Sequence, residues 1–169
     1  MARSRPQPIT TTEQVARERR VHFVARRMGF VGNIEYRHVY SQAGGAQYGL
    51  ATTAEEDLLI VYVEAFERDA DPNEFSLESI IAHERGHQLL ARHERLIRSL
   101  PPTWSDITEE IVASLVGAIL VEDEKDHRDL VLKATFAATE RGMSLEHAMS
   151  LLTGLLVLLE KILGWGLRS

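Results

Sequence analysis

The sequence predicts an α+β fold, in which a small sheet and a set of helices occupy separate parts of the chain. Three observations support this. An N-terminal segment has a helix-capping signal, three short stretches between residues 33 and 66 are rich in Val, Ile, Tyr and Thr, and the chain after residue 77 has long helical segments. Because strands and helices are segregated along the chain and do not alternate, the pattern favours α+β over α/β.

Composition limits the classes of function. The chain has 169 residues, of which 44% are hydrophobic, and this suits a single domain over residues 1–169 with its own core. The formal net charge of −6 argues against a general nucleic-acid binder. There is no cysteine, so disulfides and thiolate ligands are excluded and any zinc must be held by histidine and carboxylate.

The two ends of the chain bear on localisation. Residues 1–9 are polar, lack the apolar core of a signal peptide and are expected to form a flexible tail. The longest apolar run, Leu155–Leu159 with its neighbours, stops at Glu160 and Lys161. That run is shorter than the roughly 20 apolar residues that cross a bilayer, so we expect a soluble cytoplasmic protein without a membrane span.

The first helix is expected over residues 12–28, where Thr10 and Glu13 have the spacing of a capping box. Three strands in a meander should follow, separated by Gly44-Gly45 and by the polar residues 54–56. The expected strands span residues 33–42, 47–53 and 58–66, and residues 58–63 should be the most buried part because they are continuously apolar.

Four helices should follow the sheet. The first is expected from Leu77 to Arg98, ending before Pro101-Pro102, and the second from Ile107 to Val121 with Asp106 as its N-cap. A helical extension over residues 122–169 should contain two more, one ending near Glu140 before Gly142 and one that Ser144 caps. The last helix is apolar on more than one face, so it is either a core helix or a surface for a homodimer or another partner.

The segment AHERGHQLL, residues 82–90, contains the pattern H-E-x-x-H within the first of these helices. Residues four apart lie one turn above each other, so His83 and His87 can direct a ring nitrogen at one metal ion. Glu84 lies about 100° around the helix, where it can reach a metal-bound water without becoming a ligand. Two zinc ligands with an adjacent general base are typical of zinc metallopeptidases.

A catalytic zinc site needs a third protein ligand. His93 is ten residues after His83, but a continuous helix would carry it about 15 Å along the axis, so it is interpreted as a surface residue. Glu109 and Glu110 open the next helix and remain alternatives. We favour Glu110, because Glu109 can serve in a capping box. Glu110 also begins a face of small residues that allows close helix packing, made of Ala113, Ser114, Gly117 and Ala118.

The stretches FSLESIIAHERGHQLL and EEIVASLVGAIL together resemble the ImmA/IrrE-type zinc metallopeptidases, and the compact gluzincins have the same ligand set. The resemblance covers about residues 47–121. It implies a zincin-like fold, with Zn²⁺ bound by His83, His87 and Glu110 and with Glu84 as catalytic base. It also implies hydrolysis of a peptide or protein substrate by a zinc-bound water.

Two other functions stay open at this stage. Zinc could serve a non-catalytic regulatory or structural role, although such a site has no need of an unligated acid at Glu84. A metal-free protein that uses its last helix for interactions is the other possibility. For the peptidase, a second group that stabilises the oxyanion is expected, and the candidates are Tyr48, His127 and His147. Substrate would lie extended along an exposed sheet edge.

Overall fold

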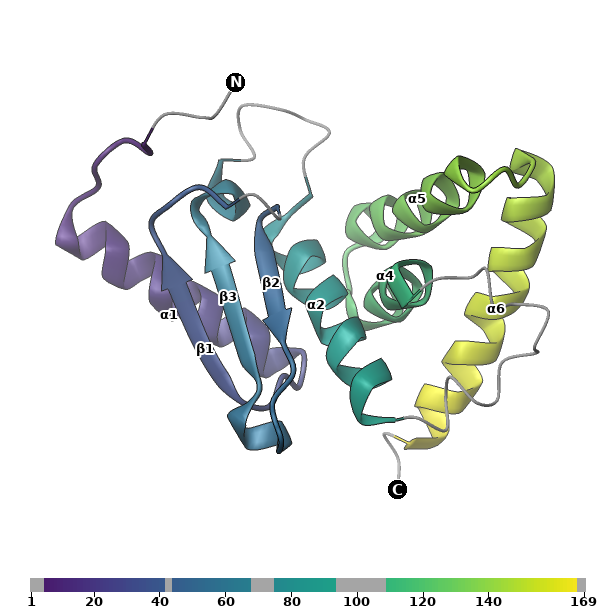
Figure 1. Cartoon of the computed structure of the whole chain (residues 1–169), viewed down its shortest axis with the longest axis horizontal. Helices are drawn as coiled ribbons and strands as arrows, with labels where there is room; N and C mark the ends of the chain where they lie inside the picture. Colours follow the sequence, from purple (N-terminus) through teal and green to yellow (C-terminus); the bar gives the residue numbers. More distant parts are fainter. Residues whose placement is uncertain (1–4, 42–43, 68–74, 94–108, 167–169) are drawn as a thin grey trace.

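The computed structural model describes residues 5–41, 44–67, 75–93 and 109–166. Over these residues the chain forms five α-helices and a three-stranded mixed sheet. Strands and helices are segregated along the chain, which confirms the α+β class. The sheet and α1 form one half of the molecule, α4, α5 and α6 form the other, and α2 runs between the two halves (Figure 1).

Helix α1, Thr11–Arg27, begins where the sequence predicted. The side chain of Thr10 accepts a hydrogen bond from the Glu13 backbone N–H, so Thr10 is the N-cap. The Glu13 carboxylate pairs with Arg17, one turn later, instead of returning to the cap. The helix buries Val21, Val24 and Ala25 against the sheet.

The sheet has the strand order β1-β3-β2, so the predicted meander is wrong. Strand β3, Leu58–Tyr62, is central, with β1 (Asn33–Arg37) parallel to it on one side and β2 (Ala46–Gly49) antiparallel on the other. The most apolar strand takes this place because a central strand is covered by a neighbour on each side. Residues 58–63 are the most buried part of this region, as predicted. Short 3₁₀ helices over Ala54–Glu56 and Val63–Phe66 precede and follow β3.

Helix α2, Leu77–Arg92, starts as predicted but ends earlier. The Ser76 hydroxyl caps it by accepting the backbone N–H of Ser79. The last buried residues of the helix are Leu89 and Leu90, and His93 has left the helical conformation. Packing sustains helices more than propensity does, which accounts for an end close to the last buried turn. The predicted stop at Pro101-Pro102 and the predicted Asp106 cap lie outside the described residues.

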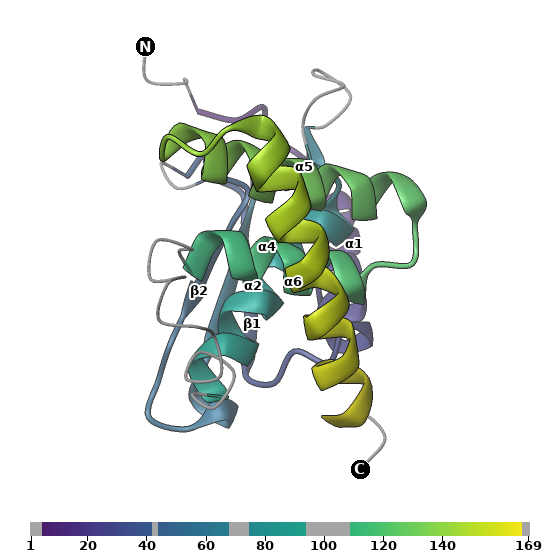
Figure 2. The same cartoon turned by 90° about the vertical axis from the view of Figure 1, so that its right-hand side faces the viewer.

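In the described part of the chain after α2 there are three helices, in agreement with the prediction: α4 (Glu109–Leu120), α5 (Glu124–Glu140) and α6 (Leu145–Gly166). The Asp123 side chain caps α5 by accepting hydrogen bonds from two backbone N–H groups of its first turn. Gly142 has a φ of 89°, which glycine adopts without strain, and so allows the turn after α5. Ser144 accepts the backbone N–H of His147 at the start of α6, as expected for a cap. Figure 2 shows α6 crossing in front of α4, with α5 above it.

Two clusters of buried apolar residues build the core. One lies between α1, the sheet and the first half of α2, and the other joins α4, α5 and α6. Helix α2 belongs to both clusters, through Leu77 and Ile81 in the first and through Leu89 and Leu90 in the second. The residues between these two pairs, which include the H-E-x-x-H motif, are therefore fixed from both sides.

The expectation of no membrane-spanning helix needs correction. The segment Leu145–Gly164 forms 20 helical residues and is long and apolar enough, by length and composition, to cross a bilayer; 28% of its most apolar part is buried. The prediction rested on the unbroken apolar run before Glu160 and Lys161. Isolated polar residues such as Thr153 do not interrupt a helix, so the apolar segment is longer than that run. None of the described contacts identifies a partner for this helix.

A buried ion pair attaches the C-terminal end of α2 to the sheet. Asp57, which is 0% exposed, accepts hydrogen bonds from Arg92, Gln88, Tyr48 and the backbone N–H of Ala51. Burial by itself would raise the pKa of Asp57, but these donors outweigh it and hold that pKa well below its ordinary value. The carboxylate thus fixes the end of the helix that carries both motif histidines.

We expect Asp57→Asn to lower the free energy of unfolding by about 2 kcal/mol, because the new amide would present a donor to groups that already donate. Urea unfolding at pH 7 would measure this difference. Glu56→Gln, at the exposed neighbouring residue, is the matched control and should change stability little. Equal stability of both variants and wild type would contradict this role of Asp57.

Candidate metal centre

The candidate site depends on an unusually close approach of α2 and α4. A Cβ atom added to Gly86 would lie 2.3 Å from the backbone oxygen of Ala113. One added to Gly117 would lie 3.0 Å from the backbone of Ala82. Backbone therefore meets backbone at two points, Gly86 in α2 and Gly117 in α4. The small-residue face predicted for α4 is buried there, with Ala113, Ser114 and Ala118 each at most 1% exposed.

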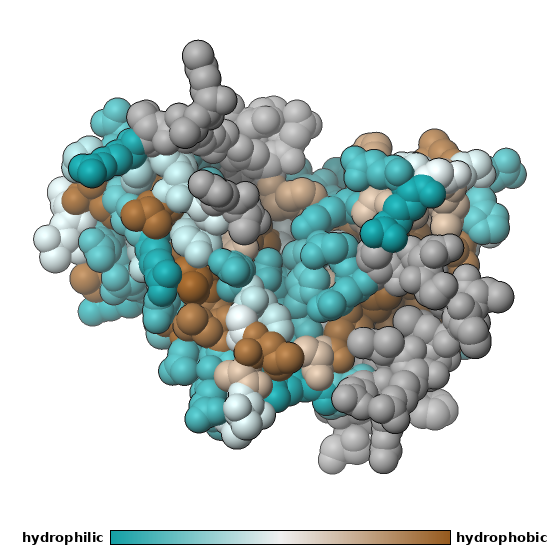
Figure 3. Space-filling view, in the orientation of Figure 1, coloured by the Kyte–Doolittle hydropathy of each residue, from teal (hydrophilic) through white to brown (hydrophobic). Residues whose placement is uncertain are grey.

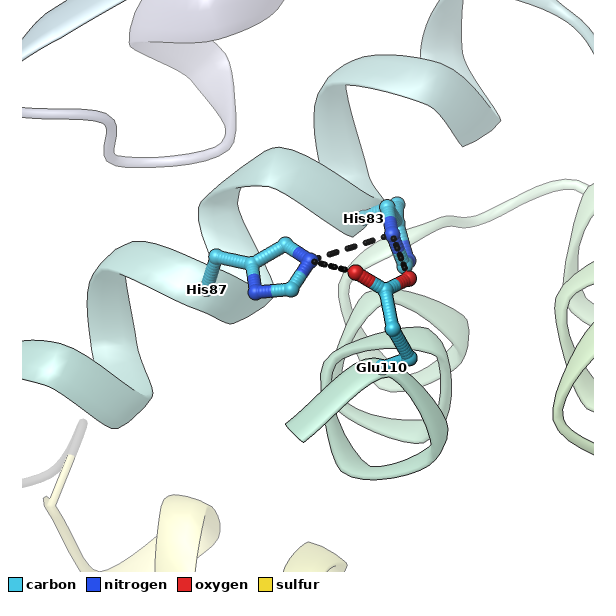
Figure 4. A group of neighbouring side chains, drawn as sticks. All are labelled: His83, His87 and Glu110. Carbon is cyan, nitrogen blue, oxygen red and sulfur yellow. Dashed lines mark hydrogen bonds and ion pairs between the residues drawn. The ribbon is translucent and has the colours of Figure 1, made fainter. Parts of the chain in front are cut away.

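This approach brings His83, His87 and Glu110 together (Figure 4). The Nε2 atoms of the two histidines are 3.2 Å apart. Oε2 of Glu110 lies 3.2 Å from Nε2 of His83, and Oε1 lies 3.3 Å from Nε2 of His87. Two ring nitrogens from one helix and a carboxylate from the next thus face a common point, and this group could hold a metal ion.

Ser114 fixes the orientation of the His83 ring. Its hydroxyl lies 2.9 Å from the backbone oxygen of Glu110 and 3.1 Å from Nδ1 of His83. A carbonyl can only accept, so the hydroxyl donates its one proton there and accepts the N–H at Nδ1. Nε2 of His83 therefore carries a lone pair, directed at the common point.

Glu109 has the same effect on His87. Its Oε1 atom lies 2.9 Å from Nδ1 of His87. A carboxylate accepts, so Nδ1 carries the proton and Nε2 carries the lone pair. Glu109 and Glu110 are adjacent in sequence but contact opposite nitrogens of the same ring, so Glu110 faces the common point and Glu109 orients the ring from behind.

The charges of the group favour a cation. Burial lowers the pKa of His83, which keeps the ring neutral at pH 7. Contact with His83 lowers the pKa of Glu110 to about 2, so its carboxylate is ionised. A bound cation would take the place of any proton shared among these atoms, and three electron-pair donors would then converge on it. In a tetrahedral site with bonds of about 2.0–2.1 Å, ligand atoms are about 3.3 Å apart, which matches the observed 3.2–3.3 Å.

A cleft of about 790 Å³ opens onto the group. Its walls come from β2 and the residues before it, from α2, and from α4 and α5. Figure 3 shows hydrophilic side chains over the middle of one face, between the sheet half and the helical half. The side chain of Glu110 is 60% exposed, so the donor group has access to solvent.

Glu84 lines the same cleft but does not belong to the donor group. It is half-buried, and burial raises the pKa of its carboxyl, while His87, Lys133 and a hydrogen bond with the Tyr48 backbone act in the opposite direction. A carboxylate with a raised pKa beside a metal site is suited to accept a proton. Helical spacing predicts that Glu84 lies beside the helix face that carries the two histidines, and its position in the cleft agrees with this.

The structure gives the other candidates different surroundings. His93 is exposed and outside the donor group. Tyr48 lines the cleft, but its hydroxyl donates to Asp57, and burial together with Asp57 raises the pKa of Tyr48 to about 12. His127 contacts the backbone oxygen of Ala118 through Nδ1, and His147 is exposed at the start of α6. Neither of these two histidines lines the cleft.

Lys133 on α5 lines the cleft and was not among the site residues predicted from the sequence. It lies three residues after Leu130, within an otherwise apolar stripe that continues through Ala134 and Ala138. A lysine in such a stripe is a signal that the sequence contained. The orienting roles of Ser114 and Glu109 were also missed, because they depend on where the two helices cross.

Comparisons with known proteins give the chain no relatives: no family model, no curated protein and no solved structure matches it. The resemblance to ImmA/IrrE-type metallopeptidases therefore rests on the two motif segments alone.

We expect Gly86→Ala to separate α2 from α4, because the new methyl group would overlap the Ala113 backbone. The free energy of unfolding should fall by about 1–3 kcal/mol, and zinc affinity should fall with it. Gly154→Ala is the control, since Gly154 is an exposed residue of α6 with no atom within 4 Å of an added Cβ, and alanine there should stabilise slightly. Unfolding curves and zinc titrations of both variants would test this. Wild-type stability and wild-type zinc affinity in Gly86→Ala would contradict the close approach of the two helices.

The two adjacent glutamates should differ in their effect on metal affinity. Glu109→Gln removes an orienting contact and should weaken zinc binding by ~10- to 100-fold. Glu110→Gln removes a donor atom and should weaken it more. Competition with a chromophoric chelator would measure both constants. A larger effect for Glu109→Gln would mean that the two residues have exchanged roles.

Proposed function

We propose that the protein is a zinc-dependent peptidase. The observation that carries the proposal is the convergence of three potential ligand atoms, from His83, His87 and Glu110, beside an acid that does not belong to this group. Donors that are two imidazoles and one carboxylate suit zinc, and three protein ligands leave the fourth position of a tetrahedral ion to water or substrate. A purely structural site would fill that position with protein.

The roles of the residues follow from their positions. Zn²⁺ held by these three side chains would act as a Lewis acid and lower the pKa of a water molecule to about 7. Glu84 would accept a proton from that water and deliver it to the amine that leaves the peptide bond. Ser114 and Glu109 would keep the two rings in the tautomers that bind metal.

The sheet edge supports a peptide as substrate. Strand β2 pairs with β3 on one side, and within the described sheet its other edge has no partner strand. Ala46, Gln47 and Tyr48 of β2 line the cleft together with Glu84. An extended peptide could add to this edge through backbone hydrogen bonds, which would bring a peptide carbonyl close to the donor group.

The decisive experiment is Glu84→Gln. The variant should keep one zinc per chain and lose at least ~100-fold in peptide hydrolysis, because the amide cannot accept the proton. Zinc content by atomic emission and cleavage of a mixed peptide library followed by mass spectrometry would measure both. Glu78→Gln, on the same helix but outside the cleft, is the matched control and should behave as wild type.

Two outcomes would contradict the proposal. Full activity of Glu84→Gln would remove Glu84 from the mechanism. A wild-type protein that binds one zinc but cleaves no peptide of the library would exclude a peptidase and leave a non-catalytic zinc protein. Treatment with a chelator should abolish hydrolysis in the wild type, and added zinc should restore it.

A further inference from the structure

Lys133 supplies the positive charge of the cleft. It is the only lysine or arginine among the described residues that line the cleft, whereas four of those residues are glutamates. Helix α5 directs it there from the wall that faces α2 and α4, since Leu130, one turn earlier, lines the same cleft. The side chain is half-buried and does not extend freely into solvent.

Lys133 lies near the donor group and has no ion-pair partner among the described residues. Its Nζ atom lies 5.6 Å from the centre of the Phe75 ring, which favours a cation at that place. Its charge acts on Glu110 and Glu84, yet no described carboxylate forms an ion pair with it. By contrast Lys125, on the same helix, pairs with Asp129 at 2.6 Å.

A half-buried ammonium group has an electrostatic cost unless an anion approaches it. Glu110 would donate its charge to a bound metal ion, and Glu84 would be neutral after it accepts a proton. The group that would gain from Lys133 is then a negatively charged oxygen on the substrate side of the cleft. Tyr48, His127 and His147 do not offer such a donor, because each is committed elsewhere or lies outside the cleft.

We propose that Lys133 binds the oxyanion that forms when a peptide carbonyl is attacked in this cleft. This inference rests on the proposed peptidase function. The oxygen of water forms a bond to the carbonyl carbon, the π-electron pair moves to the carbonyl oxygen, and Lys133 stabilises that charge. When the pair returns, the C–N bond breaks and the amine leaves with the proton that Glu84 held.

The first test measures anion binding and does not require an identified substrate. Zinc-loaded protein is titrated with inorganic phosphate, a tetrahedral anion, by calorimetry. Lys133→Met should weaken phosphate binding about tenfold while the zinc content stays at one per chain, and Lys133→Arg should retain most of the affinity. Lys125→Met makes the same change of net charge on the same helix outside the cleft and should bind phosphate as wild type does.

The second test uses hydrolysis of a peptide that the wild type cleaves. Lys133→Met should lower kcat about 100-fold with KM changed less than about threefold, because the contact forms with the transition state. Lys133→Arg should recover much of the rate. Lys133→Gln serves as a second neutral variant, with the circular dichroism spectrum and zinc content as checks of folding.

The outcomes separate the two proposals. Unchanged phosphate affinity in folded, zinc-loaded Lys133→Met and Lys133→Gln would overturn the role of Lys133, even if the wild type is a peptidase. An effect on KM alone would overturn it too, since that would indicate binding of the ground state. Weaker phosphate binding in a protein that cleaves no peptide would support the anion site and reject the proposed function.

Discussion

The contact between the backbones of α2 and α4 is the constraint on which the rest of the site depends. Gly86 and Gly117 each lie where a methyl group would meet the backbone of the other helix. Because the helices touch at these points, Glu110 at the start of α4 reaches both histidines of α2. The same crossing buries Ser114 next to His83. Moving the two helices apart to admit a methyl group would exceed the tolerance of metal coordination, which is about 0.2 Å in each bond. The packing of the helices and the geometry of the donor group therefore depend on the same contact.

Around this contact, each motif histidine has its second ring nitrogen occupied. Ser114 contacts Nδ1 of His83, and Glu109 contacts Nδ1 of His87. Both partners come from α4, so the helix that supplies the carboxylate also selects the tautomers of the rings it faces. The position of α2 is in turn fixed at its far end, where Asp57 attaches Arg92 and Gln88 to the sheet. The donor group is therefore preorganised by polar contacts in the middle of α2 and at its C-terminal end.

The cleft combines three parts of the chain that are distant in sequence. Strand β2 offers a sheet edge, α2 offers Glu84, and α5 offers Lys133. Helix α5 belongs to the segment that the sequence analysis treated as an extension, yet it forms a wall of the cleft. The described lining contains four glutamates and one lysine, and a metal ion together with Lys133 would balance much of that negative charge. This arrangement suits a reaction in which negative charge moves from the attacking water to the carbonyl oxygen.

Features that depend on local spacing could be predicted from the sequence: the α+β class, the caps at Thr10 and Ser144, the histidines one turn apart, and the small-residue face beside Glu110. The remaining features arise from contacts between elements that are distant along the chain. The order of the strands, the different contacts of Glu109 and Glu110, the early end of α2 and the place of Lys133 all depend on how elements pack. Helical periodicity fixes which residues share a face, but it does not fix where two helices cross or which neighbour covers a strand. Local patterns therefore identified the chemistry, and packing across the chain decided its geometry.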